Sequence, residues 1–221
     1  MGKYVLALLA LAAVAGAADL AGVRAAPAGE AREPGRLDPS DGLIDLGWDR
    51  GGVYGGFVWI TGLGVWAGSD FDISTLATYN HVASGRIYYY PHFPNEIFEG
   101  NREGVWSFAG GAPGSLLWGP TFVRGTAFGW NSYAVGWTLG AVTAFVMAFE
   151  QYYDYPNCDP VTTCAHGAGS GDHSWIRYGG AWHHWWETGN GNFALMIRCI
   201  VDNSYSGVAP ASLGRVKALY R

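Results

Sequence analysis

The sequence is poor in charged residues, and this shortage excludes several classes of function. Asp, Glu, Lys and Arg make up 14% of the 221 residues, and the formal net charge is −5. A nucleic-acid-binding surface needs clustered Lys and Arg, so the composition gives no support for one. Because aromatic residues reach 15% while charge is low, the composition also argues against an intrinsically disordered chain.

Helical periodicity and long apolar runs are scarce as well. Beyond the N-terminus, no apolar run is long enough to span a membrane. Apolar residues recur with a spacing of three in the C-terminal segment 212–221, at Leu213, Val216 and Leu219. This spacing predicts a short basic amphipathic helix at the end of the chain, and little else favours helix.

A recognisable catalytic motif is also missing. No serine stands in a G-x-S-x-G sequence, and no phosphate-binding loop or dinucleotide fingerprint occurs. Asp172 and His173 are adjacent, and adjacent Asp and His residues rarely orient one another as a catalytic triad requires. A glycosidase would need a carboxylate pair from Glu99, Glu103 and Glu150, whose separation the sequence does not set. We therefore expect a protein that is not an enzyme, with a small glycan hydrolase as an alternative.

The N-terminal residues predict export. Lys3 precedes an apolar run, Tyr4–Val14, and the run ends in the small-residue cleavage pattern Ala15–Ala17. We interpret residues 1–17 as a signal peptide; a membrane anchor or a helix packed on the domain is the alternative. The mature protein is then expected to be secreted, in the periplasm, in the extracellular space or at the cell surface.

The rest of the chain divides into a linker, one domain and a tail. Residues 18–41 contain few large apolar side chains and are predicted to be a flexible linker. In residues 42–205, short apolar or alternating runs are separated by Gly, Pro, Asn and Asp, as in antiparallel β-proteins. We predict an all-β fold: a single antiparallel β-sandwich, jelly-roll-like, of about eight to ten strands. Residues 206–221 form the C-terminal tail.

Several motifs of this domain resemble a known kind of protein module. Val105–Gly114 reads VWSFAGGAPG, Gly136 and Trp137 follow as a GW pair, and Gly191–Arg198 reads GNFALMIR. These motifs resemble those of accessory β-sandwich domains in secreted, modular bacterial surface proteins. The resemblance implies a jelly-roll-like sandwich that binds or spaces rather than catalyses. It also implies that such domains sit beside proteases or other surface modules.

The cysteines suggest a disulfide. Cys158 and Cys164 flank a five-residue loop, and in an exported protein the default for such a pair is a disulfide. Cys199 is left over within the last predicted strand, where we expect a buried thiol. A pairing of Cys199 with either loop cysteine is the alternative.

Acidic and amide side chains surround the same loop and raise the question of a metal ion. Oxygen ligands on loops suit Ca²⁺, and the candidates are Asp154, Asn157, Asp159 and Asp172. Their spacing matches no EF-hand, and turns are rich in Asp and Asn for local reasons. We expect no cofactor beyond this possible structural Ca²⁺.

An aromatic cluster gives the candidate ligand-binding residues, Tyr178, Trp182, Trp185 and Trp186. Exposed aromatic faces stack on sugar rings, whereas buried ones fill the core. So many rings cannot all lie on one buried face, and we expect at least one of these tryptophans to be partly exposed.

Taken together, the sequence predicts a secreted, non-catalytic module for adhesion, spacing or surface attachment. Its expected partner is an extracellular or cell-surface protein or glycan. The alternative is a carbohydrate-binding module that uses the cluster from Trp182 to Trp186.

Overall fold

The computed structural model describes residues 20–25, 42–49, 53–60, 62–76, 78–89, 98–159, 161–164, 171–189 and 193–203. The predicted signal peptide, residues 1–17, and the predicted tail, residues 206–221, lie outside these ranges. Within the predicted linker, Leu20–Ala25 form a strand that pairs with Val53–Trp59. The described residues include no apolar helix of membrane-spanning length.

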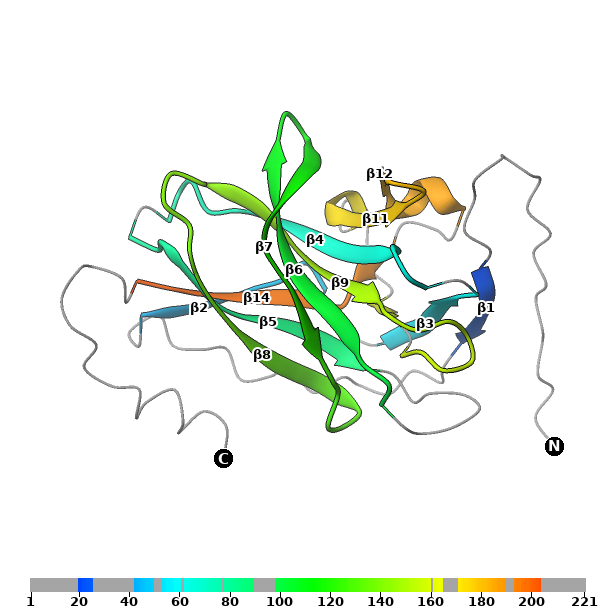
Figure 1. Cartoon of the computed structure of the whole chain (residues 1–221). Helices are drawn as coiled ribbons and strands as arrows, with labels where there is room; N and C mark the ends of the chain where they lie inside the picture. Colours follow the sequence, from blue (N-terminus) through cyan, green and yellow to red (C-terminus); the bar gives the residue numbers. More distant parts are fainter. Residues whose placement is uncertain are drawn as a thin grey trace.

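Two antiparallel sheets form the fold, so the prediction of an all-β sandwich is confirmed (Figure 1). The first sheet has eight strands: β1 (Leu20–Ala25), β3 (Val53–Trp59), β10 (Val161–Cys164), β5 (His81–Tyr89), β14 (Ile197–Asp202) and β2 (Leu43–Leu46) in order, with β8 (Gly129–Thr138) on β5 and β13 (Ala194–Leu195) on β10. The second has six: β12 (Ala181–His184), β11 (Ser174–Tyr178), β4 (Trp66–Asp72), β9 (Ala144–Gln151), β6 (Asn101–Ala109) and β7 (Ala112–Val123). Two short 3₁₀ helices, η2 (Gly171–His173) and η3 (Trp185–Thr188), flank the β11–β12 hairpin.

The β6–β7 hairpin turns at a pair of glycines. Gly110 and Gly111 lie at the turn with φ angles of 64° and 81°, a region that glycine adopts without strain. In Figure 1, the tip of this hairpin projects beyond the body of its sheet. β7 is the edge strand of its sheet, and its pairing with β6 shifts register at three places along the hairpin.

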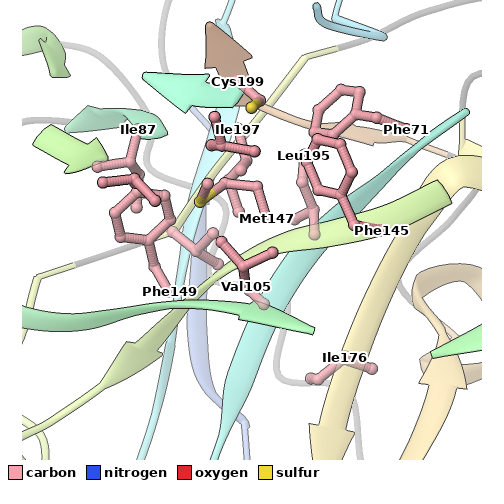
Figure 2. Packing of buried hydrophobic residues seen from close by; sticks show 14 of the residues in the cluster. Phe71, Ile87, Val105, Phe145, Met147, Phe149, Ile176, Leu195, Ile197 and Cys199 are labelled. Carbon is pink, nitrogen blue, oxygen red and sulfur yellow. The ribbon is translucent and has the colours of Figure 1, made fainter. Parts of the chain in front are cut away.

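The main core lies between the two sheets. Phe145, Met147 and Phe149 alternate along β9 and are buried against Ile87 of β5 and Ile197 of β14 (Figure 2). This period of two is the strand pattern, in which every second side chain faces the same side. Burial of these large side chains supplies the principal stabilisation of the sandwich.

A second apolar layer covers the outer face of the second sheet. Trp66 and Trp106 pack edge to face, with ring centroids 5.2 Å apart, and both are almost fully buried. Small residues beneath make room for them: a Cβ on Gly104 would lie 3.0 Å from the Trp66 ring. Both faces of β6 are therefore covered along most of its length.

The predicted disulfide between Cys158 and Cys164 is wrong in this structure. All three cysteines are buried thiols. Cys164 packs with Val53 and Met196 in a small cluster on one face of the first sheet, whereas Cys199 faces the main core on the other. Cys164 of β10 and Cys199 of β14 face opposite sides of the sheet, so this alternative pairing fails as well, and Cys199 forms no disulfide with Cys158 either. The loop thiol of Cys158 lies near Asp159 instead, and burial raises its pKa to about 12.

Candidate ligand-binding site

The structure separates the predicted aromatic cluster. Trp185 is fully buried and packs edge to face on Phe57, with centroids 4.9 Å apart. Trp182 packs on Trp106 in the outer aromatic layer, at 5.3 Å. Trp186 is 45% exposed, which confirms that at least one of these tryptophans reaches solvent.

Strand register explains this separation. Trp175 pairs with His184 and Arg177 pairs with Trp182, so these four side chains share the outer face of the β11–β12 hairpin. Tyr178 lies on the other face, where its ring stacks on His183 at 4.4 Å. The chain enters η3 at Trp185, and this side chain turns into the core. The four predicted residues therefore form no common platform.

The predicted calcium ligands serve other partners in the structure. The carboxylate of Asp154 accepts a hydrogen bond from the Gly62 amide at 2.8 Å, and Asp159 accepts one from the Gly100 amide at 2.7 Å. The Asn157 amide donates to the Asp154 carbonyl, and Asp172 is exposed on η2. In the ranges that the structure describes, no three His, Cys, Asp or Glu side chains form a group suited to a metal. Calcium stays a prediction.

An open cavity of about 360 Å³ lies elsewhere, where β6, β7 and the end of β9 meet. Its walls are Arg102, Pro120, Phe122, Tyr152 and Tyr153. Strand pairing builds this cavity. Arg102 of β6 is opposite Phe122 of β7 on one side and Glu150 of β9 on the other, so these three side chains form a row on the outer face.

Three aromatic rings surround the cavity. The Phe122 ring lies 5.5 Å from that of Tyr152 and 6.4 Å from that of Tyr153, in edge-to-face arrangements. Phe122 is 46% exposed and Tyr153 is 37% exposed, although aromatic side chains are usually more buried. Contiguous exposed apolar side chains on a soluble domain commonly mark an interaction site.

Buried polar groups hold these rings in place. The side-chain amide of Gln151, itself 3% exposed, donates to the carbonyls of Trp59 and Tyr153 at 2.7 and 2.8 Å. Its oxygen accepts from the Trp59 amide at 2.9 Å. Since these bonds join the loop after β9 to the end of β3, the cavity is preorganised rather than formed by a free loop.

The single charged group of the cavity wall is fixed by a buried carboxylate. The Nε of Arg102 donates to Oε2 of Glu150, which is 1% exposed, and Oε1 of Glu150 accepts from the Gly64 amide at 2.6 Å. The hydrogen bond to Glu150 raises the pKa of Arg102. The guanidinium also lies 5.2 Å from the centre of the Tyr152 ring. The cavity thus combines exposed ring faces with an oriented hydrogen-bond donor.

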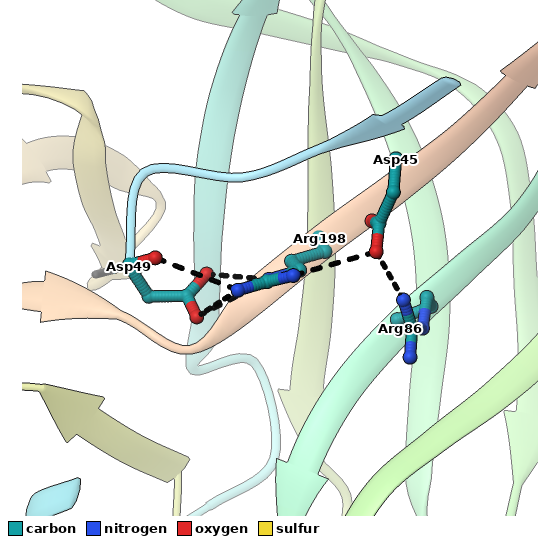
Figure 3. A network of polar contacts seen from close by, with 4 residues as sticks. All are labelled: Asp45, Asp49, Arg86 and Arg198. Carbon is teal, nitrogen blue, oxygen red and sulfur yellow. Dashed lines mark hydrogen bonds and ion pairs between the residues drawn. The ribbon is translucent and has the colours of Figure 1, made fainter. Parts of the chain in front are cut away.

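A second arginine–carboxylate cluster, on the first sheet, is closed instead. Arg198 binds both carboxylate oxygens of Asp49 and contacts Asp45, which in turn binds Arg86 (Figure 3). The side chains of Asp45 and Asp49 are 7% and 2% exposed. Both guanidiniums lie over the Trp130 ring. Because its groups are buried and serve one another, this cluster joins the segment after β2 to β5 and β14.

Two of the carboxylates considered for a glycosidase lie on opposite faces of the second sheet. Glu103 faces the interior between the sheets, whereas Glu150 of the neighbouring strand is on the outer face. Glu99 precedes β6, in the loop whose amides bind Asp159. Glu103 and Glu150 therefore do not form a pair of carboxyl groups that could flank one glycosidic bond.

Sequence reasoning missed the cavity residues. Arg102, Phe122 and the pair Tyr152 and Tyr153 belong to three separate segments, and no motif in the sequence connects these segments. The available signal was the alternation of residues 102–108, which places Arg102 on the same face as Trp106. The pairing of β6 with both β7 and β9 completes the site, and this pairing is a property of the fold.

Comparison with known proteins adds a relationship of fold. No protein-family model and no curated protein matches the chain. Among solved structures, the chain is similar to the clostridial cysteine protease Cwp84 after propeptide cleavage, with a TM-score of 0.52 and 12% sequence identity. The match covers 75% of this chain and 41% of the protease chain. At this identity, the likeness concerns the fold alone.

Proposed function

We propose that the chain is an exported, non-catalytic β-sandwich module that attaches to a glycan through the cavity bounded by Arg102, Phe122 and Tyr153. This proposal keeps the predicted role in adhesion or surface attachment and transfers the predicted carbohydrate site from the Trp182–Trp186 segment to this cavity. One observation carries it: two half-exposed ring faces flank a guanidinium that a buried carboxylate orients.

The chemistry of the cavity suits a sugar ring. The C–H face of a pyranose packs on aromatic rings, and its hydroxyls accept hydrogen bonds from a guanidinium. A volume of about 360 Å³ falls at the small end of the range for small-molecule sites, which fits one or two sugar units. The separated positions of Glu103 and Glu150 support binding without hydrolysis.

The test is binding of the purified chain to a panel of oligosaccharides, followed by thermal unfolding and calorimetry. A ligand that binds the folded state alone raises the melting temperature. We expect Phe122→Ala and Tyr153→Ala each to weaken binding by about tenfold, the equivalent of about 1.4 kcal/mol of ring contact. Phe122 and Tyr153 are 46% and 37% exposed, so the variants should stay folded and lose little of the wild-type melting temperature without ligand.

The matched control is Phe128→Ala. Phe128 is 42% exposed, close to Phe122 in exposure, but it packs on Phe98 at 5.1 Å and lines no part of the cavity. We expect this variant to bind as the wild type does. Binding that survives loss of Phe122 and Tyr153, or release of reducing sugar from any bound glycan, would contradict the proposal.

A further inference from the structure

The cavity carries no surplus positive charge. Arg102 is the one charged residue of its wall, and Glu150 neutralises it at hydrogen-bond distance. The second oxygen of Glu150 is occupied by the Gly64 amide, so this carboxylate cannot turn away to leave the guanidinium unpaired. The pair is formally neutral.

The charged residues next to the cavity do not change this balance. Asp154 follows Tyr153 in the chain and is exposed, which adds a negative charge to the same loop. Arg124, the residue that follows β7, does not line the cavity; its Nη2 donates to the Glu99 carbonyl at 3.4 Å, which directs it toward the loop before β6. An acidic ligand would therefore meet a neutral or slightly negative site, where its desolvated carboxylate would lack a counter-charge.

Hydrogen-bond donors are nevertheless present. The bond to Glu150 occupies the Nε of Arg102, and within the described residues its two terminal nitrogens have no protein acceptor. A guanidinium offers five N–H groups in a fixed plane, so up to four of them are left for a ligand. The Arg102 side chain is 30% exposed, which makes these donors accessible.

We infer that the cavity selects a neutral pyranose, whose hydroxyl oxygens accept from the terminal nitrogens of Arg102 while its C–H face packs on Phe122 or Tyr153. This inference rests on the proposed function and specifies its ligand class. Glu150 is a positioning residue: it contacts no ligand, but it orients the guanidinium and cancels its charge.

Calorimetry with two oligosaccharide classes tests the charge preference. One class holds neutral oligomers of glucose, mannose, galactose and xylose; the other holds galacturonate oligomers and sialylated oligosaccharides. We expect the tightest ligand to be neutral, and its Kd to change less than about twofold between about 50 and 500 mM NaCl, since salt screens only charged partners. Tighter binding of an acidic ligand would overturn the inference but leave the proposed function intact. Binding of neither class would overturn both.

Two variants test the pair directly. Arg102→Gln should weaken binding of the neutral ligand by roughly tenfold or more, because a charged hydrogen-bond donor is lost. Glu150→Gln keeps the shape and an acceptor for Gly64 but leaves the guanidinium uncompensated, so binding should shift toward acidic ligands and become salt-dependent. Arg124→Gln removes an equal charge outside the cavity and should change neither preference. If Glu150→Gln does not fold, Arg102→Gln and the wild-type salt series still decide the question. A wild-type ligand preference in both variants would refute the assigned roles.

Discussion

The carboxyl group of Glu103 faces the α-carbon of Gly85 across the interior of the sandwich. A Cβ on Gly85 would lie 2.0 Å from Oε1 of Glu103, so only glycine fits opposite this side chain. Glu103 is fully buried, and neither of its oxygens makes a hydrogen bond of normal geometry. Burial raises the pKa of Glu103 to about 9, with a small opposing effect of the Gly85 amide. The core thus contains a protonated carboxylic acid at neutral pH.

This acid makes stability depend on pH. The pKa in the fold lies above the unfolded value of about 4.5, so its contribution is fully present below pH 4.5 and is lost as pH rises toward about 9. The free energy of unfolding should fall by up to about 1.4 kcal/mol for each pH unit in that window. The Glu103→Gln side chain cannot ionise, so the unfolding free energy of this variant should depend less on pH. Its stability relative to the wild type should therefore increase as pH rises. Urea denaturation from about pH 5 to pH 9 measures both profiles.

The control for this titration is Glu187→Gln. Glu187 is exposed on η3, so its removal should leave the slope of the wild-type profile unchanged. An equal slope in the wild type and in Glu103→Gln would show that Glu103 does not carry the dependence.

The buried cluster in Figure 3 predicts that substitution of Arg198 strongly destabilises the fold. Arg198→Met leaves the carboxylates of Asp49 and Asp45 with less compensation in a buried site, and should cost about 3–5 kcal/mol of unfolding free energy. The double variant Arg198→Met with Asp49→Leu removes the orphaned charge and should regain part of this loss. Chemical denaturation of the wild type, the two single variants and the double variant gives the coupling energy between Arg198 and Asp49. A value below about 0.5 kcal/mol would show that this ion pair does not stabilise the fold.

Substitution of the adjacent residues Trp185 and Trp186 should lower the free energy of unfolding by very different amounts. Trp185→Ala removes a fully buried ring from the core and should cost about 3–5 kcal/mol. Trp186→Ala removes a ring that is 45% exposed and stacked on His184, and should cost less than about 1 kcal/mol. Circular dichroism during urea unfolding measures both. Similar losses for the two variants would mean that η3 does not turn Trp185 inward.

Thiol chemistry tests the state of the cysteines. Burial raises the pKa of both Cys158 and Cys199, and thiolates are the reactive form. We expect little reaction of the native protein with a thiol reagent, and reaction of all 3 cysteines after unfolding in urea. Reductant should leave the melting temperature unchanged. If fewer than 3 thiols react after unfolding under non-reducing conditions, the protein contains a disulfide and the assignment of three thiols is wrong.

The sequence was sufficient for the class of fold but insufficient for the positions of its side chains. The alternation within 102–108 and the glycine pair Gly110 and Gly111 are local patterns, and in the structure they form a strand and its turn. The side chains of His183 and His184 point to opposite faces of β12, as strand geometry requires of adjacent residues.

The candidate site depends on contacts that local patterns do not report. Arg102 meets Phe122 and Glu150 through strand pairings between segments 20 and 48 residues apart, and these pairings fix which rings are exposed. A run of aromatic residues such as Trp182–Trp186 is conspicuous in the sequence, yet a change from β12 to η3 divides it between core and surface. The disulfide prediction failed for the same reason, because spacing along the chain does not specify the direction of a side chain.

The outer aromatic layer has a consequence for how strand β9 keeps its alignment. In most sheets, a slip of one residue is prevented because it would exchange apolar side chains with polar ones. Residues 145–149 of β9 are apolar on both faces and all buried, so polarity cannot distinguish the two alignments. Size distinguishes them: Phe145, Met147 and Phe149 need the wide space between the sheets, while Val146 and Ala148 fit beneath the indoles of Trp66 and Trp106. Over this apolar stretch of β9, alignment is encoded in side-chain volume.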